Sequence, residues 1–135
     1  MARYHPQKNI IKFLEAVKLL NYSLDEPIEY HWYGQKYIDT NGNPTKASIY
    51  YFQCEKYREK ENLTNVFLNN FSNETITILQ TIDIFCLPSL YESFSDALSE
   101  AICCGKPRQA TYQIINVLLR MERMDFYSIL TIYSI

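Results

Sequence analysis

Hydrophobic and polar positions alternate along the chain with two different periods. Apolar residues recur at helical spacing over residues 8–20, which predicts an amphipathic helix that ends near Asn21. The short aromatic and β-branched run IEYHWYG, Ile28–Gly34, predicts a strand, and DTNGNP after it predicts a loop. The alternation then continues with helices predicted over residues 46–60, 73–82 and 95–104 and strands over residues 65–71 and 83–89.

This order of elements predicts the fold class. Strands that alternate with helices favour an α/β fold, an open parallel Rossmann-like sheet with helices on both faces. In such sheets ligands bind outside the carboxyl ends of the strands. The loop PSLYES, residues 88–93, follows the predicted strand DIFCL, and the helix after it closes at Gly105. We therefore expect the functional site at this loop.

Composition and charge narrow the possible partners. A chain of 135 residues that is 47% hydrophobic and holds three glycines has the composition of about one small globular domain. The formal net charge is −2 and the basic residues are scattered, which argues against nucleic acid or anionic lipid as a partner. No apolar run is long enough for a transmembrane segment, and the start MARYHPQKN lacks the apolar stretch of a signal peptide. These features predict a cytoplasmic protein.

The four cysteines predict no metal site. Cys54, Cys86, Cys103 and Cys104 lack the spacing of a zinc site, and the last two are adjacent on a predicted helix, where they cannot converge on one ion. We expect all four to be buried, reduced thiols.

The stretch PSLYESFSDALSEAICCGKP, residues 88–107, places Glu92 and Glu100 eight positions apart around the start of a helix. Ser95 is a candidate N-cap, and the helix start would direct unpaired N–H groups at a phosphate, with one acid near each end of an extended ligand. Two carboxylates about 5 to 9.5 Å apart would instead suit a glycosidase. Solvated surface charges are the third interpretation, and the residues alone leave all three open.

Two motifs resemble the family 4 glycosyltransferases. Residues 88–107 are similar to the family's E-x7-E signature, P-S-x-x-E-G-F-x-x-x-x-x-E-A-x-x-C-G-x-P. Residues 2–20, ARYHPQKNIIKFLEAVKLL, are similar to its G-R-x-x-x-x-K-(G/N) loop and the helix that follows. Ser93 and Ala2 stand where the family commonly has glycine. Asn69 and Asn70 also stand near such a glycine, which predicts a positive φ there.

The resemblance implies a retaining, metal-independent glycosyltransferase without a cofactor. It would move a sugar from a nucleoside-diphosphate-sugar donor to a saccharide or lipid-linked acceptor. Glu92 would be the catalytic group and hold hydroxyls of the transferred sugar. The implied donor-binding set is Arg3, Lys8, Ser93, Phe94, Ser95 and Glu100. Within it the two cations would bind the diphosphate, Glu100 the ribose, and N–H groups near Phe94 and Ser95 the sugar and phosphate.

The resemblance covers residues 2–107, part of the C-terminal donor-binding domain of a two-domain GT-B enzyme. Residues 108–135 are unlike the family, and apolar residues from Ile114 to Met121 predict a helix there. One allowed coding of MERMDFYSILTI, residues 121–132, yields the family's N-G-F-L-F motif when it is read in a shifted frame, and the glycine and the leucine of that motif arise whichever synonymous codons are used. Our hypothesis is that residues from about Arg108 onward are a frameshift product and that the isolated chain has little or no transferase activity. The alternative is a non-catalytic nucleotide-binding or interaction module, which would bind without turnover.

Overall fold

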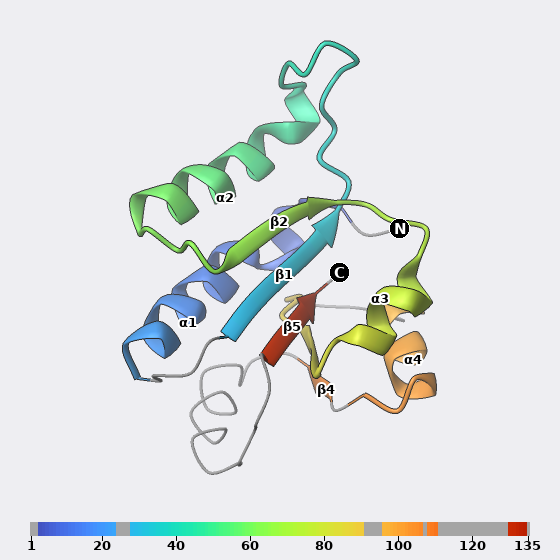
Figure 1. The fold of residues 1–135 in the computed structure, drawn as a ribbon. Helices are drawn as coiled ribbons and strands as arrows, with labels where there is room; N and C mark the ends of the chain where they lie inside the picture. Colours follow the sequence, from blue (N-terminus) through green and yellow to red (C-terminus); the bar gives the residue numbers. More distant parts are fainter. Residues whose placement is uncertain (1–2, 24–27, 91–95, 107, 111–129, 135) are drawn as a thin grey trace.

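The computed structural model describes residues 3–23, 28–90, 96–106, 108–110 and 130–134 (Figure 1). Five parallel strands form one sheet in the order β2-β1-β5-β3-β4. The strands are β1 (Ile28–Gly34), β2 (Val66–Asn70), β3 (Ile84–Leu87), β4 (Arg108–Ala110) and β5 (Leu130–Ser134). The helices are α1 (Ile10–Ser23), α2 (Ile49–Lys60), α3 (Thr75–Thr81) and α4 (Asp96–Cys103), with 3-10 turns η1 (Pro6–Lys8) and η2 (Lys46–Ser48).

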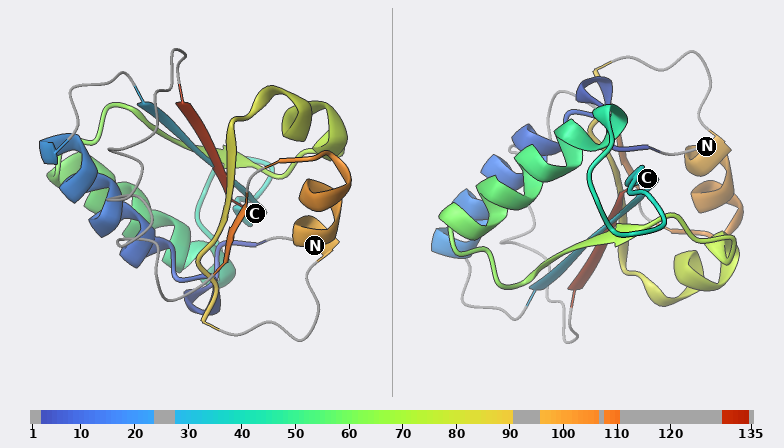
Figure 2. Two further views of the ribbon diagram at one scale, coloured as in Figure 1. Left: turned by 90° about the horizontal axis from the view of Figure 1, so that it is seen from below. Right: turned by 90° about the horizontal axis from the view of Figure 1, so that it is seen from above.

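The helices cover both faces of the sheet, as predicted. Figure 2 shows α1 and α2 on one side of the strands and α3 and α4 on the other. On the first face Tyr30 and Trp32 of β1 are fully buried, and their rings lie 6.1 and 5.6 Å from Phe13 of α1. On the second face Leu79 of α3 and Phe85 of β3 are buried in another cluster. Burying these apolar side chains drives the helices onto the sheet and gives the Rossmann-like α/β class.

Most predicted elements are confirmed, with shifted ends. β1 has the predicted bounds, whereas β2 and β3 are each shorter than the predicted strands. α1 begins at Ile10 and not at Lys8, because Lys8 closes η1 and Asn9 adopts the left-handed conformation, with φ 59°. α3 is shorter than the helix predicted over residues 73–82, because Glu74 is its N-cap residue and Ile82 its C-cap residue.

β5 was not predicted. Five of its residues pair with β1 and two with β3, so it lies in the interior of the sheet. Its pairing partners are distant in the sequence, and a segment as short as LTIYS does not by itself distinguish a strand from part of a helix. The helix predicted from Ile114 to Met121 lies outside the described residues.

Two expectations about single residues were wrong. Among the described residues, the non-glycine residues with positive φ are Asn9, Tyr37 and Asn62, and not Asn69 or Asn70. Both lie within β2, where pairing with β1 keeps the backbone extended.

The cysteines also differ from the expectation of four buried thiols. Cys54 and Cys86 are buried in the core of the first face. Cys103 is exposed and Cys104 partly exposed, because they fall at the C-terminal end of the short helix α4, whose one fully buried residue is Ala101.

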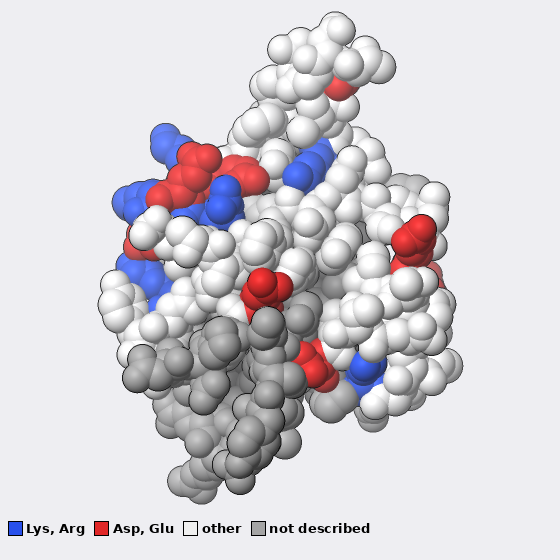
Figure 3. Space-filling view, in the orientation of Figure 1, with Lys and Arg blue, Asp and Glu red and all other residues white. Residues whose placement is uncertain are grey.

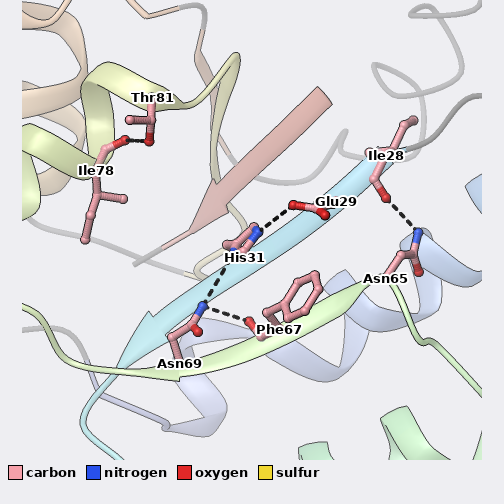
Figure 4. A network of polar contacts seen from close by, with 8 residues as sticks. All are labelled: Ile28, Glu29, His31, Asn65, Phe67, Asn69, Ile78 and Thr81. Carbon is pink, nitrogen blue, oxygen red and sulfur yellow. Dashed lines mark hydrogen bonds and ion pairs between the residues drawn. The ribbon is translucent and has the colours of Figure 1, made fainter. Parts of the chain in front are cut away.

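On the second face of the sheet, polar and aromatic contacts connect side chains of β1 with side chains of β2 (Figure 4). The His31 ring stacks on Phe67 with centroids 4.7 Å apart. Its Nε2 lies 3.3 Å from a Glu29 carboxylate oxygen, and its Nδ1 lies 3.4 Å from Asn69 Nδ2. With the Asn69 amide as donor, Nδ1 is an acceptor and Nε2–H donates to Glu29. Phe67 thus packs against His31 on this face although it remains 40% exposed.

The charged surface shown in Figure 3 carries both signs. Lysine, arginine and acidic side chains gather over α2, where Arg58 Nε donates to Glu55 at 2.8 Å. Lys18 of α1 forms an ion pair with Glu61 at 2.6 Å. Within the described ranges, no helix is both long and apolar enough to cross a membrane.

Candidate functional site

The N-terminal segment lies beside the carboxyl end of β1 and contacts that of β2. Arg3 forms a parallel bridge with Gln35, directly beyond β1, and the Tyr4 N–H donates to the Gln35 carbonyl at 3.3 Å. The Tyr4 hydroxyl donates to the Asn69 carbonyl of β2 at 2.9 Å. Arg3 itself is exposed. Tyr4 therefore fixes Arg3 at the edge where ligands of parallel sheets bind.

A close approach between Tyr4 and Gly34 makes this arrangement possible. A Cβ added to Gly34 would lie 3.3 Å from Tyr4 Cδ2, closer than ordinary van der Waals contact. The Tyr4 ring packs edge-on against Tyr51 of α2, with centroids 4.9 Å apart. Burial raises the pKa of the Tyr4 hydroxyl, so it stays protonated and remains a hydrogen-bond donor.

Lys8 lies on a short, well-capped turn that follows. His5 is the N-cap of η1, and its Nδ1 accepts from the Gln7 N–H at 3.3 Å. The turn ends at Asn9, whose left-handed backbone (φ 59°, ψ 35°) lets its N–H donate to the Pro6 carbonyl at 2.9 Å. Asparagine is one of the few residues with a side chain that adopt this conformation readily. Lys8 is thus carried on a defined backbone between Arg3 and α1.

Two hydrogen bonds join the Lys8 turn to the segment after β3. The Leu90 N–H donates to the Gln7 carbonyl at 2.8 Å, and Asn9 Nδ2 donates to the Pro88 carbonyl at 3.1 Å. We call this pair of bonds the Asn9 clamp. It brings together segments that are about eighty positions apart in the sequence. Pro88 and Leu90 are in the first part of the predicted loop, so the clamp holds the turn that carries Lys8 against the start of that loop.

Four of the predicted site residues lie outside the described residues. They are Glu92, Ser93, Phe94 and Ser95. Their geometry, and the N-cap role predicted for Ser95, therefore stay predictions.

Glu100 lies on the second turn of α4 and is partly exposed. Its carbonyl accepts from the Cys104 N–H at 3.0 Å, and the next residue, Ala101, is buried against the sheet. The helix is closed by Gly105 in the left-handed conformation, with φ 68°. Glu100 is therefore presented by a helix that begins just after the predicted loop.

Ser89 is a further polar group at this edge. It is 1% exposed, and its hydroxyl has no hydrogen-bond partner among the described residues. The position is part of the Pro-Ser pair of the signature stretch, but no local pattern indicates that its hydroxyl is buried.

Lys36 is a cation that sequence reasoning missed. It follows Gln35 at the end of β1, and its Nζ lies 3.2 Å from the Tyr51 hydroxyl and 4.6 Å from the centroid of that ring. Burial lowers the pKa of Lys36, although the Glu55 carboxylate opposes that shift. No motif includes this lysine, and the signal that could have placed it at this edge is its position two residues beyond Gly34, the predicted end of β1.

The site therefore combines exposed Arg3, partly exposed Lys8 and the clamp at one edge of the sheet. Guanidinium and ammonium groups suit phosphate oxygens. Among the described residues, no group of three or more histidine, cysteine or acidic side chains is placed to hold a metal ion.

Comparison with known proteins identifies one family. The family model described as "Glycosyl transferases group 1" matches residues 1–112, which is 112 of the 135 residues. No curated protein and no solved structure matches the chain.

Proposed function

The chain belongs to the group 1 glycosyl transferases, and from this premise we propose that it binds a nucleoside-diphosphate sugar at the carboxyl edge of its sheet. It transfers the sugar, with retention, to a hydroxyl of a saccharide or lipid-linked acceptor. The observation that supports this proposal best is the Asn9 clamp, which holds the Lys8 turn beside the entrance to the loop that contains Glu92.

In this proposal each group meets one part of the donor. Arg3 and Lys8 bind the diphosphate through charge-assisted hydrogen bonds. Glu92 accepts hydrogen bonds from hydroxyls of the transferred sugar, and Glu100 accepts them from the ribose. The segment of Ser93, Phe94 and Ser95 contributes backbone N–H groups to the sugar and the phosphate.

The proposed rate acceleration comes from stabilising the leaving group. As the bond between the anomeric carbon and the diphosphate breaks, negative charge grows on the phosphate oxygens. Cations and N–H groups that are already oriented lower the energy of that state more than that of the bound donor. The proposal assigns this role to Arg3, Lys8 and the loop N–H groups and includes no metal ion.

Calorimetric titration with UDP, GDP and ADP tests the donor site. We expect saturable binding of one of these nucleotides by the full chain. Lys8→Ala and Glu100→Ala should each weaken it roughly tenfold or more, the effect of losing one charge-assisted hydrogen bond. Lys12→Ala is the matched control, since Lys12 is an exposed lysine of α1 that pairs with Glu15 at 2.7 Å.

Transfer from the donor whose nucleotide binds then distinguishes a transferase from a binding module. Release of nucleotide that depends on acceptor and is lost in Glu92→Gln supports the transferase. Saturable binding without turnover supports the non-catalytic module. A chain that is folded by circular dichroism and binds none of the three nucleotides would contradict the proposed donor site.

A further inference from the structure

Lys36 is anchored at the carboxyl edge of the sheet, next to the residue that pairs with Arg3. Its backbone N–H donates to Asn70 Oδ1 at 3.4 Å, at the end of β2. The preceding residue, Gln35, forms the parallel bridge with Arg3, and its carbonyl accepts from the Tyr4 N–H. Lys36 therefore follows β1 at the same edge that carries Arg3.

The side chain of Lys36 is held by Tyr51 of α2. Its Nζ lies 3.2 Å from the Tyr51 hydroxyl and 4.6 Å from the centroid of that ring. The hydroxyl donates its own proton to Glu55 Oε1 at 2.9 Å, so its oxygen accepts from the Lys36 ammonium group. The Tyr51 ring packs in turn against Tyr4 of the N-terminal segment. The ammonium group is thus oriented by a side chain that is itself fixed on two sides.

These contacts leave the positive charge of Lys36 without a counter-ion beside it. Among the described residues, Lys36 takes part in no ion pair. Glu55 attracts it from further away, but both carboxylate oxygens of Glu55 already accept, one from Tyr51 and the other from Arg58 Nε. An ammonium group has three N–H donors, and the Tyr51 oxygen accepts one of them. Burial is the largest cause that lowers the pKa of Lys36, as expected of a partly buried cation without a counter-ion.

A cation in this setting is unfavourable for folding alone. Removing a charge from water costs free energy unless an opposite charge compensates it, and an apolar side chain of similar length would pack on Tyr51 without that cost. At an edge where parallel sheets bind ligands, the missing counter-ion points to an anionic ligand.

We propose that Lys36 is a third cation for the diphosphate of the donor, beside Arg3 and Lys8, and that the bound phosphate groups are its counter-ion. This inference rests on the proposed donor site and adds a residue to it. The N–H donors of Lys36 that Tyr51 leaves unused form charge-assisted hydrogen bonds with phosphate oxygens. A third cation also stabilises the negative charge that grows on the phosphate as the bond to the sugar breaks.

Calorimetric titration of the full chain with inorganic pyrophosphate, UDP, GDP and ADP tests this proposal. Lys36→Met removes the charge and keeps an unbranched stem against Tyr51. We expect it to bind pyrophosphate and the preferred nucleotide roughly tenfold or more weakly than the parent, the effect of losing one charge-assisted hydrogen bond. Lys36→Arg keeps the charge and should bind both more tightly than Lys36→Met. The matched control is Lys46→Met, which changes an exposed lysine of η2 and should bind as the parent does.

Urea unfolding separates this role from a structural one. A lysine that serves only to pack on Tyr51 would lower the unfolding midpoint when it is replaced. A cation that lacks its counter-ion would not, so we expect Lys36→Met to unfold at the midpoint of the parent or above it. Weaker binding together with a lower midpoint would overturn the proposal. So would parental affinity in Lys36→Met, an equal loss in Lys46→Met, or an Lys36→Arg chain that binds no more tightly than Lys36→Met.

The four ligands distinguish a failure of this inference from a failure of the donor site. Nucleotide binding that is weakened by Lys8→Ala and Glu100→Ala but not by Lys36→Met keeps the donor site and overturns the third cation. Pyrophosphate binding that depends on Lys36, with no binding of any of the three nucleotides, supports the third cation and contradicts the donor site. A folded parent that binds none of the four ligands overturns both.

Discussion

At the scale of single residues, Gly34 determines how closely Tyr4 approaches β1. Gly34→Ala would place a methyl group 3.3 Å from Tyr4 Cδ2 and 3.4 Å from the Arg3 carbonyl carbon. To relieve this contact the Tyr4 ring must move, and Arg3 must move with it. We expect a loss of about 1 to 2 kcal/mol in the free energy of unfolding, the usual cost of overpacking. Urea unfolding measures this loss, and titration should show weaker nucleotide binding.

Gly42→Ala is the control for this prediction. Gly42 has φ 82° but nothing within 4 Å of an added Cβ, and it lies in the loop after β1. The substitution should cost a similar free energy, about 1 kcal/mol, through backbone strain. It should leave nucleotide binding unchanged. Equal effects of both variants on binding would contradict a specific role for the contact between Gly34 and Tyr4.

Asp39 organises the same loop through its carboxylate. Its Oδ1 accepts from the N–H groups of Asn43 at 2.7 Å and Asn41 at 2.9 Å. These bonds, that of Asn43 foremost, lower the pKa of Asp39. A carboxyl with a lowered folded-state pKa stabilises the fold above its ordinary pKa of about 3.9, and that stabilisation is lost as the pH falls through the lower value. Asp39→Asn should therefore be less stable than the parent at pH 7, and the stabilities of the two chains should converge in acid.

NMR titration of the Asp39 carboxyl measures the shift directly. We expect its midpoint to lie below the ordinary range, with the amide signals of Asn41 and Asn43 moving at the same pH. A midpoint at or above about 3.9 would show that these bonds do not favour the charged form.

At the scale of elements, the local sequence pattern was sufficient to predict an element where the segment also contains the residue that ends it. β1 was predicted to the residue because its aromatic and β-branched run stops at Gly34, and in the structure the strand alternates buried and partly exposed positions. The motif identified Arg3, Lys8 and Glu100 as candidates. It did not reveal the Asn9 clamp or β5, because both depend on contacts between segments far apart in the sequence. Such contacts are set by the sheet order, which no single segment encodes.

The Asn9 clamp gives an element-scale prediction. Asn9→Gly keeps the left-handed backbone but loses the side-chain bond to Pro88, at about 1 kcal/mol. Asn9→Ala loses the bond and also strains the backbone, at about 2 kcal/mol in total. Urea unfolding should rank the parent above Asn9→Gly and Asn9→Gly above Asn9→Ala. Nucleotide affinity should follow the same order, because the turn that carries Lys8 loosens in the same order. An alanine variant with parental affinity would argue against the clamp as a positioning device.

At the scale of the whole molecule, the alternating order of elements predicted the parallel sheet with helices on both faces. It did not predict that residues 130–134 complete the middle of that sheet. The frameshift hypothesis for the residues from about Arg108 onward stays a prediction, and sequencing the genomic locus tests it. A downstream reading frame without further motifs of the family would contradict it. Should the hypothesis hold, β5 would be a strand from outside the family's own sequence that the sheet holds by backbone pairing with β1 and β3.

Thiol labelling can test whether this sheet unfolds as one cooperative unit in the intact chain. Burial raises the pKa of both Cys54 and Cys86 to about 12, so almost no thiolate forms at pH 8 while the chain is folded. Both lie in the core cluster on the α1 and α2 face. We expect a thiol reagent to label Cys103, which is exposed, and more slowly Cys104 in native buffer. Mass spectrometry across a urea series should then show Cys54 and Cys86 becoming reactive together, at the midpoint of unfolding, because they share one cluster. Labelling of Cys86 well before Cys54 would mean that β3 separates from the sheet on its own.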